Sequence, residues 1–123
     1  MISIKSIQDI IKETKDNGFP IIIFGAGATG QVLLQSCLDE GLEIECFCDD
    51  NIKKKNTTVS GVNIVHTAEV KALYPDANFL ISAADIHDMI DNLSSIGYSK
   101  KRLYPAVSFL KDYDLNKFYK FQK

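Results

Sequence analysis

A glycine-rich turn, set between a short apolar run and an amphipathic stretch, constrains this chain more than any other feature. Residues 21–24 are an unbroken apolar run, typical of a strand buried on both faces of a parallel sheet. Gly25, Gly27 and Gly30 follow with the spacing G-x-G-x-x-G. In a dinucleotide-binding unit the first glycine permits a tight turn, the second lets a diphosphate approach the backbone, and the third lets the helix pack closely on the strand. The pattern therefore predicts a strand, a phosphate-binding turn and a helix.

The helix expected after the turn has free N–H groups and the positive end of its dipole at its start, which favours an anionic ligand. We expect the whole turn to take part in ligand binding. Its residues are Gly25, Ala26, Gly27, Ala28, Thr29 and Gly30. The side chains expected to face the sheet are those of Val32, Leu33, Cys37 and Leu38. Gly41 is expected to end the helix in a left-handed conformation.

An acidic pair follows the second expected strand. Residues 43–48 are predicted to form that strand, and Asp49 and Asp50 come directly after it, about 20 residues beyond the glycines. In dinucleotide-binding domains an acidic residue at this place holds a ribose hydroxyl. Asp49 or Asp50 is therefore a candidate ribose ligand.

Three consecutive lysines, residues 53–55, follow the acidic pair. They are either a solvated loop or a source of one lysine near a phosphate or acidic sugar. A basic cluster also suits a 2′-phosphate, but the acidic pair ahead of it would repel one. The sequence thus favours NAD or a nucleotide-sugar over NADP.

The remaining elements alternate between helix and strand. We expect a first helix over residues 3–17 with Ser6 as a candidate N-cap, a third strand after Gly61, a short helix capped by Thr67, a fourth strand over 78–82, a helix capped by Asp85, and a fifth strand over 102–107. Such alternation predicts an α/β fold, a three-layer Rossmann-like sandwich with a parallel sheet of about five strands. Ser82 ends the fourth strand, across the ligand crevice from the glycine-rich turn, and is a further candidate ligand contact.

The length of 123 residues predicts one domain over residues 1–108 and an aromatic-rich tail or linker over 109–123. The tail holds five of the chain's twelve aromatic residues, too many to leave in water without inviting association. We expect it to pack back on the domain, or to meet a partner subunit in a homo-oligomer or a catalytic domain that this chain lacks.

Composition excludes several classes of function. A net charge of −2 gives no electrostatic reason to expect nucleic acid or an anionic membrane as partner. No apolar run approaches the roughly 18 residues of a membrane span, and the first residues are amphipathic rather than a signal peptide, so a cytoplasmic location is expected. Three cysteines, Cys37, Cys46 and Cys48, lie on predicted regular elements, and we interpret them as buried small hydrophobic residues rather than disulfides or metal ligands.

No catalytic arrangement is legible. Tyr113 with Lys117 has the Y-x-x-x-K spacing of short-chain dehydrogenases, but it does not lie in the helix after a later core strand. Ile23 stands where S-adenosylmethionine-binding turns carry an acid, and no G-K-[ST] follows the glycines as in a P-loop. His87 is the one candidate acid or base near the crevice, and without a partner we expect it to be a surface residue.

Four stretches, IIIFGAGATGQVLLQ, CFCDDNIKKK, SGVNIV and ISAAD, resemble a family of small Rossmann-like domains that begin bacterial sugar-modifying enzymes. These enzymes are hexapeptide-repeat sugar acyltransferases that bind a UDP-sugar, FkbM-type methyltransferases, and nucleotide-sugar dehydratases. The resemblance covers about residues 19–108. It implies that the glycine-rich turn lies along phosphates and that Asp49 or Asp50 lies near a ribose or base.

The resemblance implies a nucleotide-binding module for sugar modification in surface-polysaccharide synthesis, with NAD or a UDP-sugar as ligand and no metal. No hexapeptide repeats and no methyltransferase core follow, so the reaction of those enzymes does not carry over. The first hypothesis is a binding module that is non-catalytic alone. The alternatives are an NAD-dependent sugar-nucleotide reductase or epimerase, with His87 or a tail tyrosine as acid or base, and the N-terminal part of a sugar acyltransferase or methyltransferase.

Overall fold

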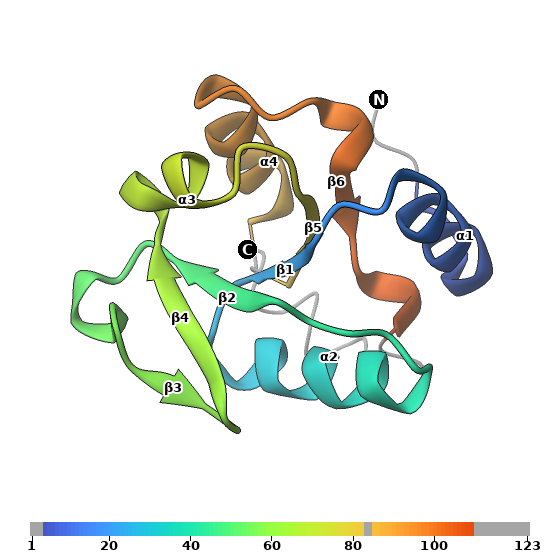
Figure 1. Cartoon of the computed structure of the whole chain (residues 1–123), viewed down its shortest axis with the longest axis horizontal. Coiled ribbons are helices and arrows are strands. Elements are labelled where there is room, and N and C mark those ends of the chain that lie inside the picture. The colour runs from blue at the N-terminus through green and yellow to red at the C-terminus, as the bar shows by residue number, and fades with distance from the viewer. Residues whose placement is uncertain (1–3, 83–84, 110–123) are drawn as a thin grey trace.

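The computed structural model describes residues 4–82 and 85–109 and shows an α/β fold (Figure 1). Helices lie on both faces of a central sheet, as the alternating sequence pattern predicts. The helices are α1 (Ile7–Asn17), α2 (Ala28–Asp39), α3 (Thr67–Leu73) and α4 (Ile86–Ser95), with short 3₁₀ turns η1 (Ile52–Lys54), η2 (Lys100–Arg102) and η3 (Val107–Phe109). The strands are β1 (Ile21–Phe24), β2 (Cys46–Asp49), β3 (Thr58–Val59), β4 (Val62–His66), β5 (Asn78–Ile81) and β6 (Leu103–Pro105).

The sheet has the strand order β3-β4-β2-β1-β5-β6. Five strands are parallel, which confirms the Rossmann-like sandwich, and β1 lies at the centre with Ile23 paired to Phe47 on one side and Leu80 on the other. The sixth strand, β3, was not predicted. It pairs antiparallel to β4 through a two-residue turn, Ser60 and Gly61, and both turn residues have positive φ as a type I′ hairpin requires.

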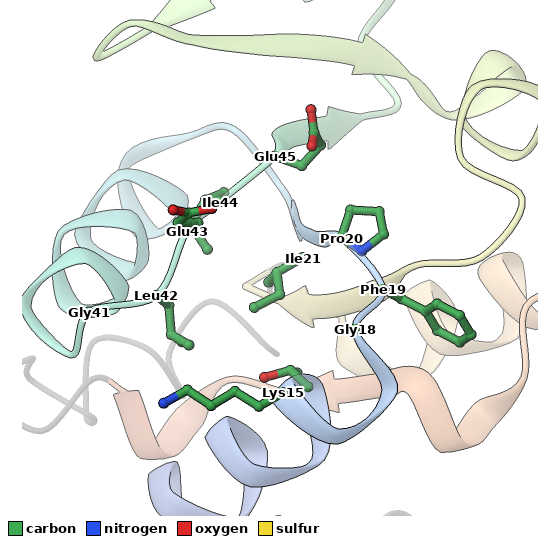
Figure 2. A pocket seen from close by; sticks show the side chains of 11 residues that line it. Lys15, Gly18, Phe19, Pro20, Ile21, Gly41, Leu42, Glu43, Ile44 and Glu45 are labelled. Atoms are coloured by element: carbon green, nitrogen blue, oxygen red, sulfur yellow. The ribbon is translucent and has the colours of Figure 1, made fainter.

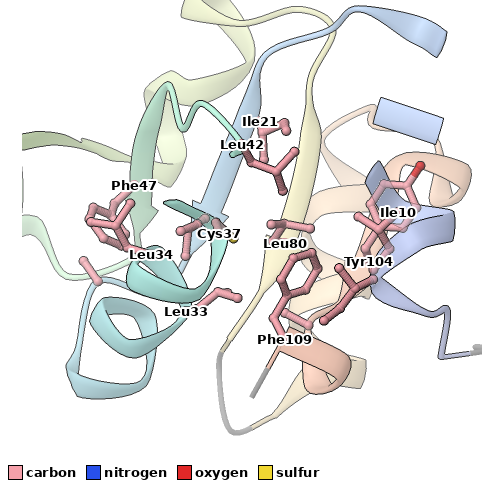
Figure 3. Packing of buried hydrophobic residues seen from close by; sticks show 14 of the residues in the cluster. Ile10, Ile21, Leu33, Leu34, Cys37, Leu42, Phe47, Leu80, Tyr104 and Phe109 are labelled. Carbon is pink, nitrogen blue, oxygen red and sulfur yellow. The ribbon is translucent and has the colours of Figure 1, made fainter. Parts of the chain in front are cut away.

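The alternation of side chains along β1 divides the core into two halves. Ile21 and Ile23 belong to the cluster beneath α1 and α2, whereas Ile22 and Phe24 belong to the cluster beneath α3 and α4. Figure 3 shows the first cluster, in which Leu33 and Cys37 of α2 meet the sheet. Both faces of β1 are therefore buried, as its unbroken apolar run predicts.

The orientation of α2 differs from the prediction. Val32 and Leu38 were expected to face the sheet but are 40% and 50% exposed, while Leu34 is 3% exposed. The buried positions of α2 are Gly30, Leu33, Leu34 and Cys37. Their spacing of i, i+3, i+4, i+7 is one face of a helix, and it begins at the glycine that packs on the turn. Once Gly30 must face the sheet, Val32 has to point away.

Helix ends follow local side-chain chemistry. Ser6 caps α1 by accepting a hydrogen bond from the Asp9 N–H at 3.1 Å, so the helix begins at Ile7 rather than at residue 3. Asp85 caps α4, as expected. The cap of α3 is His66, whose Nδ1 accepts from the Ala68 N–H, and Thr67 is the first helical residue instead of the cap. Gly18 and Gly41 have the left-handed φ expected of helix-ending glycines.

The limits of β2 and β6 differ from the predicted ones, residues 43–48 and 102–107. The second strand begins at Cys46 instead of residue 43, and Asp49 is its last residue. The fifth predicted strand is β6, at the edge of the sheet where Pro105 is tolerated. Phe109, the first residue of the expected tail, is buried in the core, and residues 110–123 lie outside the described part of the chain. No helix among the described residues is long and apolar enough to cross a membrane.

Neighbouring residues of α2 offer a test of its orientation. Leu33→Ala should lower the free energy of unfolding by about 2–5 kcal/mol, because Leu33 is fully buried. Val32→Ala, its matched control, should change it by less than about 0.5 kcal/mol, because Val32 is exposed. Urea unfolding curves of both variants measure the difference. Equal losses would mean that α2 is rotated from the orientation described here.

Candidate nucleotide-binding site

The glycine-rich turn lies at the carboxyl end of β1, between the ends of β2 and β5. Gly25 leaves the strand with a φ of 104°, in the region where side chains other than glycine are strained. Its N–H donates to the Cys48 carbonyl at 2.8 Å, so the parallel pairing of β1 with β2 continues into the turn. In open α/β sheets, ligands bind at the carboxyl ends of the strands where the strand order reverses, which here is between β1 and β5.

Gly30 is fixed by a close approach. A Cβ atom at this position would lie 1.8 Å from the Gly25 carbonyl oxygen, far inside any permitted contact. A hydrogen atom in place of the side chain is therefore what lets the first turn of α2 lie against the end of β1. This is the close helix–strand packing that the third glycine of the pattern predicts.

Gly27 has no such internal constraint. A Cβ atom there would meet nothing within 4 Å, and its φ of −82° suits any residue. Gly27 is the N-cap of α2, it provides no side-chain acceptor, and no acidic residue lies in the first turn. The first N–H groups of a helix have no intrahelical partners, and among the described residues no acceptor pairs with those of exposed Ala28 and half-buried Thr29, which suits an external acceptor. The absence of a side chain at Gly27 leaves the backbone accessible beside them.

Asp49 braces the turn from the end of β2. Its Oδ2 accepts a hydrogen bond from the Ala26 N–H at 2.9 Å, and its Oδ1 accepts one from the Asn51 N–H at 2.8 Å. The Lys54 ammonium lies 3.7 Å from Oδ2, and the Asp49 side chain is only 15% exposed. Ala26 is itself buried. The Ala26 N–H therefore serves the protein's own carboxylate, a use that the sequence did not indicate.

Asp50 is placed differently from Asp49. It is exposed, and its backbone carbonyl lies 3.1 Å from His66 Nε2, which fixes the chain direction after β2. Its side chain forms no hydrogen bond with any other residue that the structure describes. Of the two candidate ribose ligands, Asp50 is the one whose carboxylate is free.

The three lysines of the loop also differ in whether they contact an acidic side chain. Lys54 contacts Asp49 and Lys55 forms an ion pair with Glu69, while Lys53 is exposed. Two of the three thus hold the loop in place, and Lys53 is the one available to a ligand.

Ser82, the residue after β5, contacts the start of the glycine-rich turn through its hydroxyl group. It is 5% exposed, and its hydroxyl oxygen lies 2.9 Å from the Phe24 carbonyl and 3.2 Å from the Gly25 carbonyl, so it donates to this pair of acceptors. The same hydroxyl lies 3.4 Å from the place that a Gly30 Cβ would occupy. Ser82 therefore supports the close contact of strand and helix, and its contact with a ligand stays a prediction.

The start of α4 differs from the start of α2. Asp85 occupies the N-cap and Asp88 lies in the first turn, where a hydrogen bond with Asp85 raises the pKa of the Asp88 carboxyl. These acids would repel an anion. His87, the candidate acid or base, is exposed beside them. An anionic ligand is therefore better placed at α2 than at α4.

The three cysteines are buried among the apolar side chains of the core. Burial raises the pKa of Cys37, Cys46 and Cys48 to about 12, so all three thiols are protonated at neutral pH. Each side chain is buried, as expected for a small hydrophobic residue. Within residues 4–82 and 85–109, no group of three potential metal ligands comes together.

Two glycines of the turn make a matched test of the geometry. Gly30→Ala should lower the free energy of unfolding by about 1–3 kcal/mol or more, because the new methyl group overlaps the Gly25 carbonyl. Gly27→Ala should cost less than about 1 kcal/mol, because only the preference for a good N-cap is lost. Denaturant titrations measure both, and a larger loss for Gly27→Ala would contradict the geometry described.

Comparisons with known proteins agree with the fold. A search of curated proteins found no match. Among solved structures, the chain is similar to UDP-D-quinovosamine 4-dehydrogenase from Vibrio fischeri, with a TM-score of 0.53 and 22% identity over 85% of this chain and 89% of that one. Residues 19–104 match the model of the C2185-like N-terminal family, a span that runs from the residue before Pro20 to the middle of β6. The chain therefore belongs to the C2185-like N-terminal domain family.

Proposed function

We propose that this domain binds a nucleotide-sugar or a dinucleotide along the glycine-rich turn and presents it to a catalytic domain or subunit. The main support for the proposal is the start of α2. Gly27 leaves this helix end without a side-chain cap and leaves the backbone accessible beside the first N–H groups of the helix. These features together favour a phosphate group. The wider setting would be sugar modification in surface-polysaccharide synthesis.

Several neighbouring hydrogen-bond donors at the start of α2 suit the several oxygens of a diphosphate. Ala28 and Thr29 offer backbone N–H groups and Thr29 adds a hydroxyl, while Ala26 is already bonded to Asp49. A diphosphate here would thus be held from the helix side of the turn, at residues 27–30. Lys53 is exposed on the neighbouring loop, two residues after Asn51, and forms no ion pair with any residue that the structure describes.

The choice between ligands rests on Asp50. A free carboxylate after β2 suits the hydroxyl groups of an unmodified ribose, which both NAD and a UDP-sugar carry, and repels the 2′-phosphate of NADP. The structural relative from Vibrio fischeri is named for a UDP-sugar, which makes UDP-sugars the first ligands to test.

Catalysis is assigned to another domain or subunit because the described residues near the turn include no buried acid–base pair. His87 is exposed, and the hydroxyl of Ser82 faces two backbone carbonyls. Turnover of a sugar nucleotide by this chain alone, lost in His87→Ala, would replace the binding proposal with the reductase or epimerase alternative.

A panel of ligands tests the proposal directly. UDP-sugars or NAD should raise the melting temperature of the chain, with NADP, coenzyme A and S-adenosylmethionine as comparisons. A ligand at about 100 times its Kd stabilises the folded state by about 2.7 kcal/mol. Gly27→Val, which places a side chain over the accessible backbone, should remove the shift while leaving the protein folded. If no ligand on the panel binds, only a role in assembly is left for the fold.

The two aspartates separate ligand binding from folding. Asp50→Ala should weaken binding of the responsive ligand by roughly tenfold or more, the loss expected for a hydrogen bond to a charged group, with unfolding unchanged. Asp49→Ala should instead lower the free energy of unfolding by about 1–3 kcal/mol, because the Ala26 N–H loses its acceptor. Calorimetric titration and urea unfolding of both variants give the comparison. Binding that is insensitive to Asp50→Ala would rule out Asp50 as the ribose ligand.

A further inference from the structure

Two hollows open at the amino ends of the strands, the end of the sheet opposite the glycine-rich turn. Both are lined by Phe19, which lies just before β1. The first, which we call the acidic hollow, has a volume of about 470 Å³ and is lined by Thr14, Lys15, Gly18, Phe19, Pro20, Ile21 and residues 41–45 (Figure 2). The second, the basic hollow, has a volume of about 240 Å³ and lies around Lys71, Asp76, Tyr98 and Arg102.

The acidic hollow lies between the ends of α1 and α2. Its charged lining consists of Glu43, Glu45 and Lys15, so two carboxylates and one ammonium give it a net charge of −1. Glu43, Glu45 and Lys15 are exposed, and within the described residues their side chains form no ion pair. Glu45 Oε2 accepts a hydrogen bond from the Tyr74 hydroxyl at 3.4 Å, so this carboxylate lies on the side of the hollow nearest α3. The same stretch adds exposed Glu40, at the C-cap of α2.

The basic hollow lies on the other face of the sheet, near the start of β6. Lys71, Arg102 and Asp76 give its lining a net charge of +1. The Lys71 ammonium donates to the Pro75 carbonyl at 2.7 Å and lies 4.4 Å from the centre of the Tyr98 ring, which fixes the cation in place. Two further exposed lysines, Lys100 and Lys101, belong to η2 and directly precede Arg102.

Phe19 and Pro20 separate the two charged regions. Both are half-buried, and the Arg102 guanidinium lies 5.6 Å from the centre of the Phe19 ring. The surface therefore runs from acidic, through an apolar centre, to basic. Such a surface is self-complementary, because a two-fold rotation places each charged half against the opposite half of an identical copy.

We propose that this end of the sheet is the interface of a homodimer, in which the acidic hollow of each copy meets the basic hollow of the other around Phe19. The occupant is a second copy of this chain because the same surface carries both complementary charges. The interface lies at the start of β1, and the glycine-rich turn lies at its end. Dimerisation therefore leaves both nucleotide sites open, and it does not depend on nucleotide binding.

Charge reversal in the full chain tests the interface. In sedimentation equilibrium, wild-type protein should form a dimer that weakens as salt is added. Glu43→Lys with Glu45→Lys, and separately Lys100→Glu with Lys101→Glu, should each raise the dimer dissociation constant at least about tenfold, because like charges then face each other. An equimolar mixture of the two variants should form a heterodimer, which also shows that both are folded.

A control and three outcomes make the test decisive. Asp88→Lys with Asp91→Lys changes the charge on α4 by as much as the double Glu→Lys variant changes that of the acidic hollow, and it should leave dimerisation unchanged. A wild-type chain that stays monomeric at about 1 mM would overturn the proposal. So would a dimer that survives both charge reversals, or one that is lost on removal of residues 110–123 while the reversals have no effect, since the tail would then form the interface.

Discussion

The contact between Gly30 and the Gly25 carbonyl determines much of what surrounds it. The first turn of α2 lies so close to the end of β1 that no side chain fits between them. This contact fixes which face of α2 meets the sheet, and Leu33, Leu34 and Cys37 are buried as a consequence. It also places the uncapped start of the helix at the edge of the sheet, where Gly27 leaves the backbone accessible. The packing of the core and the geometry of the candidate site thus depend on one glycine.

Asp49 shows how the turn is held without a ligand. Its carboxylate accepts hydrogen bonds from Ala26 in the turn and from Asn51 in the following loop, and Lys54 contributes an ion pair. Ser82 binds the carbonyls of Phe24 and Gly25 from the opposite side. The turn is therefore supported by β2 and β5 together. A site that is organised before binding loses less conformational entropy when its ligand arrives.

Local patterns predicted the elements, and three-dimensional contacts set their details. The apolar run at residues 21–24 correctly indicated β1, and the glycine spacing correctly indicated the turn that follows it. Asp85 correctly indicated the N-cap of α4. Each of these features depends on neighbours in sequence. The exposure of Val32 could not be read from periodicity, since the rotation of α2 is fixed by the distant Gly25 carbonyl. Asp49 and Asp50 are equivalent by sequence, and only the partners of Asp49 distinguish them. The turn at Gly61 was expected, but β3 has only two residues, Thr58 and Val59, which is too short for a periodic pattern to indicate a strand.

We propose that the start of α2 receives a phosphate-bearing nucleotide. Backbone amide spectra of the ¹⁵N-labelled chain, titrated with a UDP-sugar and with NAD, test it at single residues. One of these ligands should shift the amide signals of Gly27, Ala28 and Thr29 most strongly. The Ala26 amide, which donates to Asp49, should shift less. Shifts that centre on α4 or on the basic hollow, or an absence of shifts with either ligand, would contradict a nucleotide site at the start of α2.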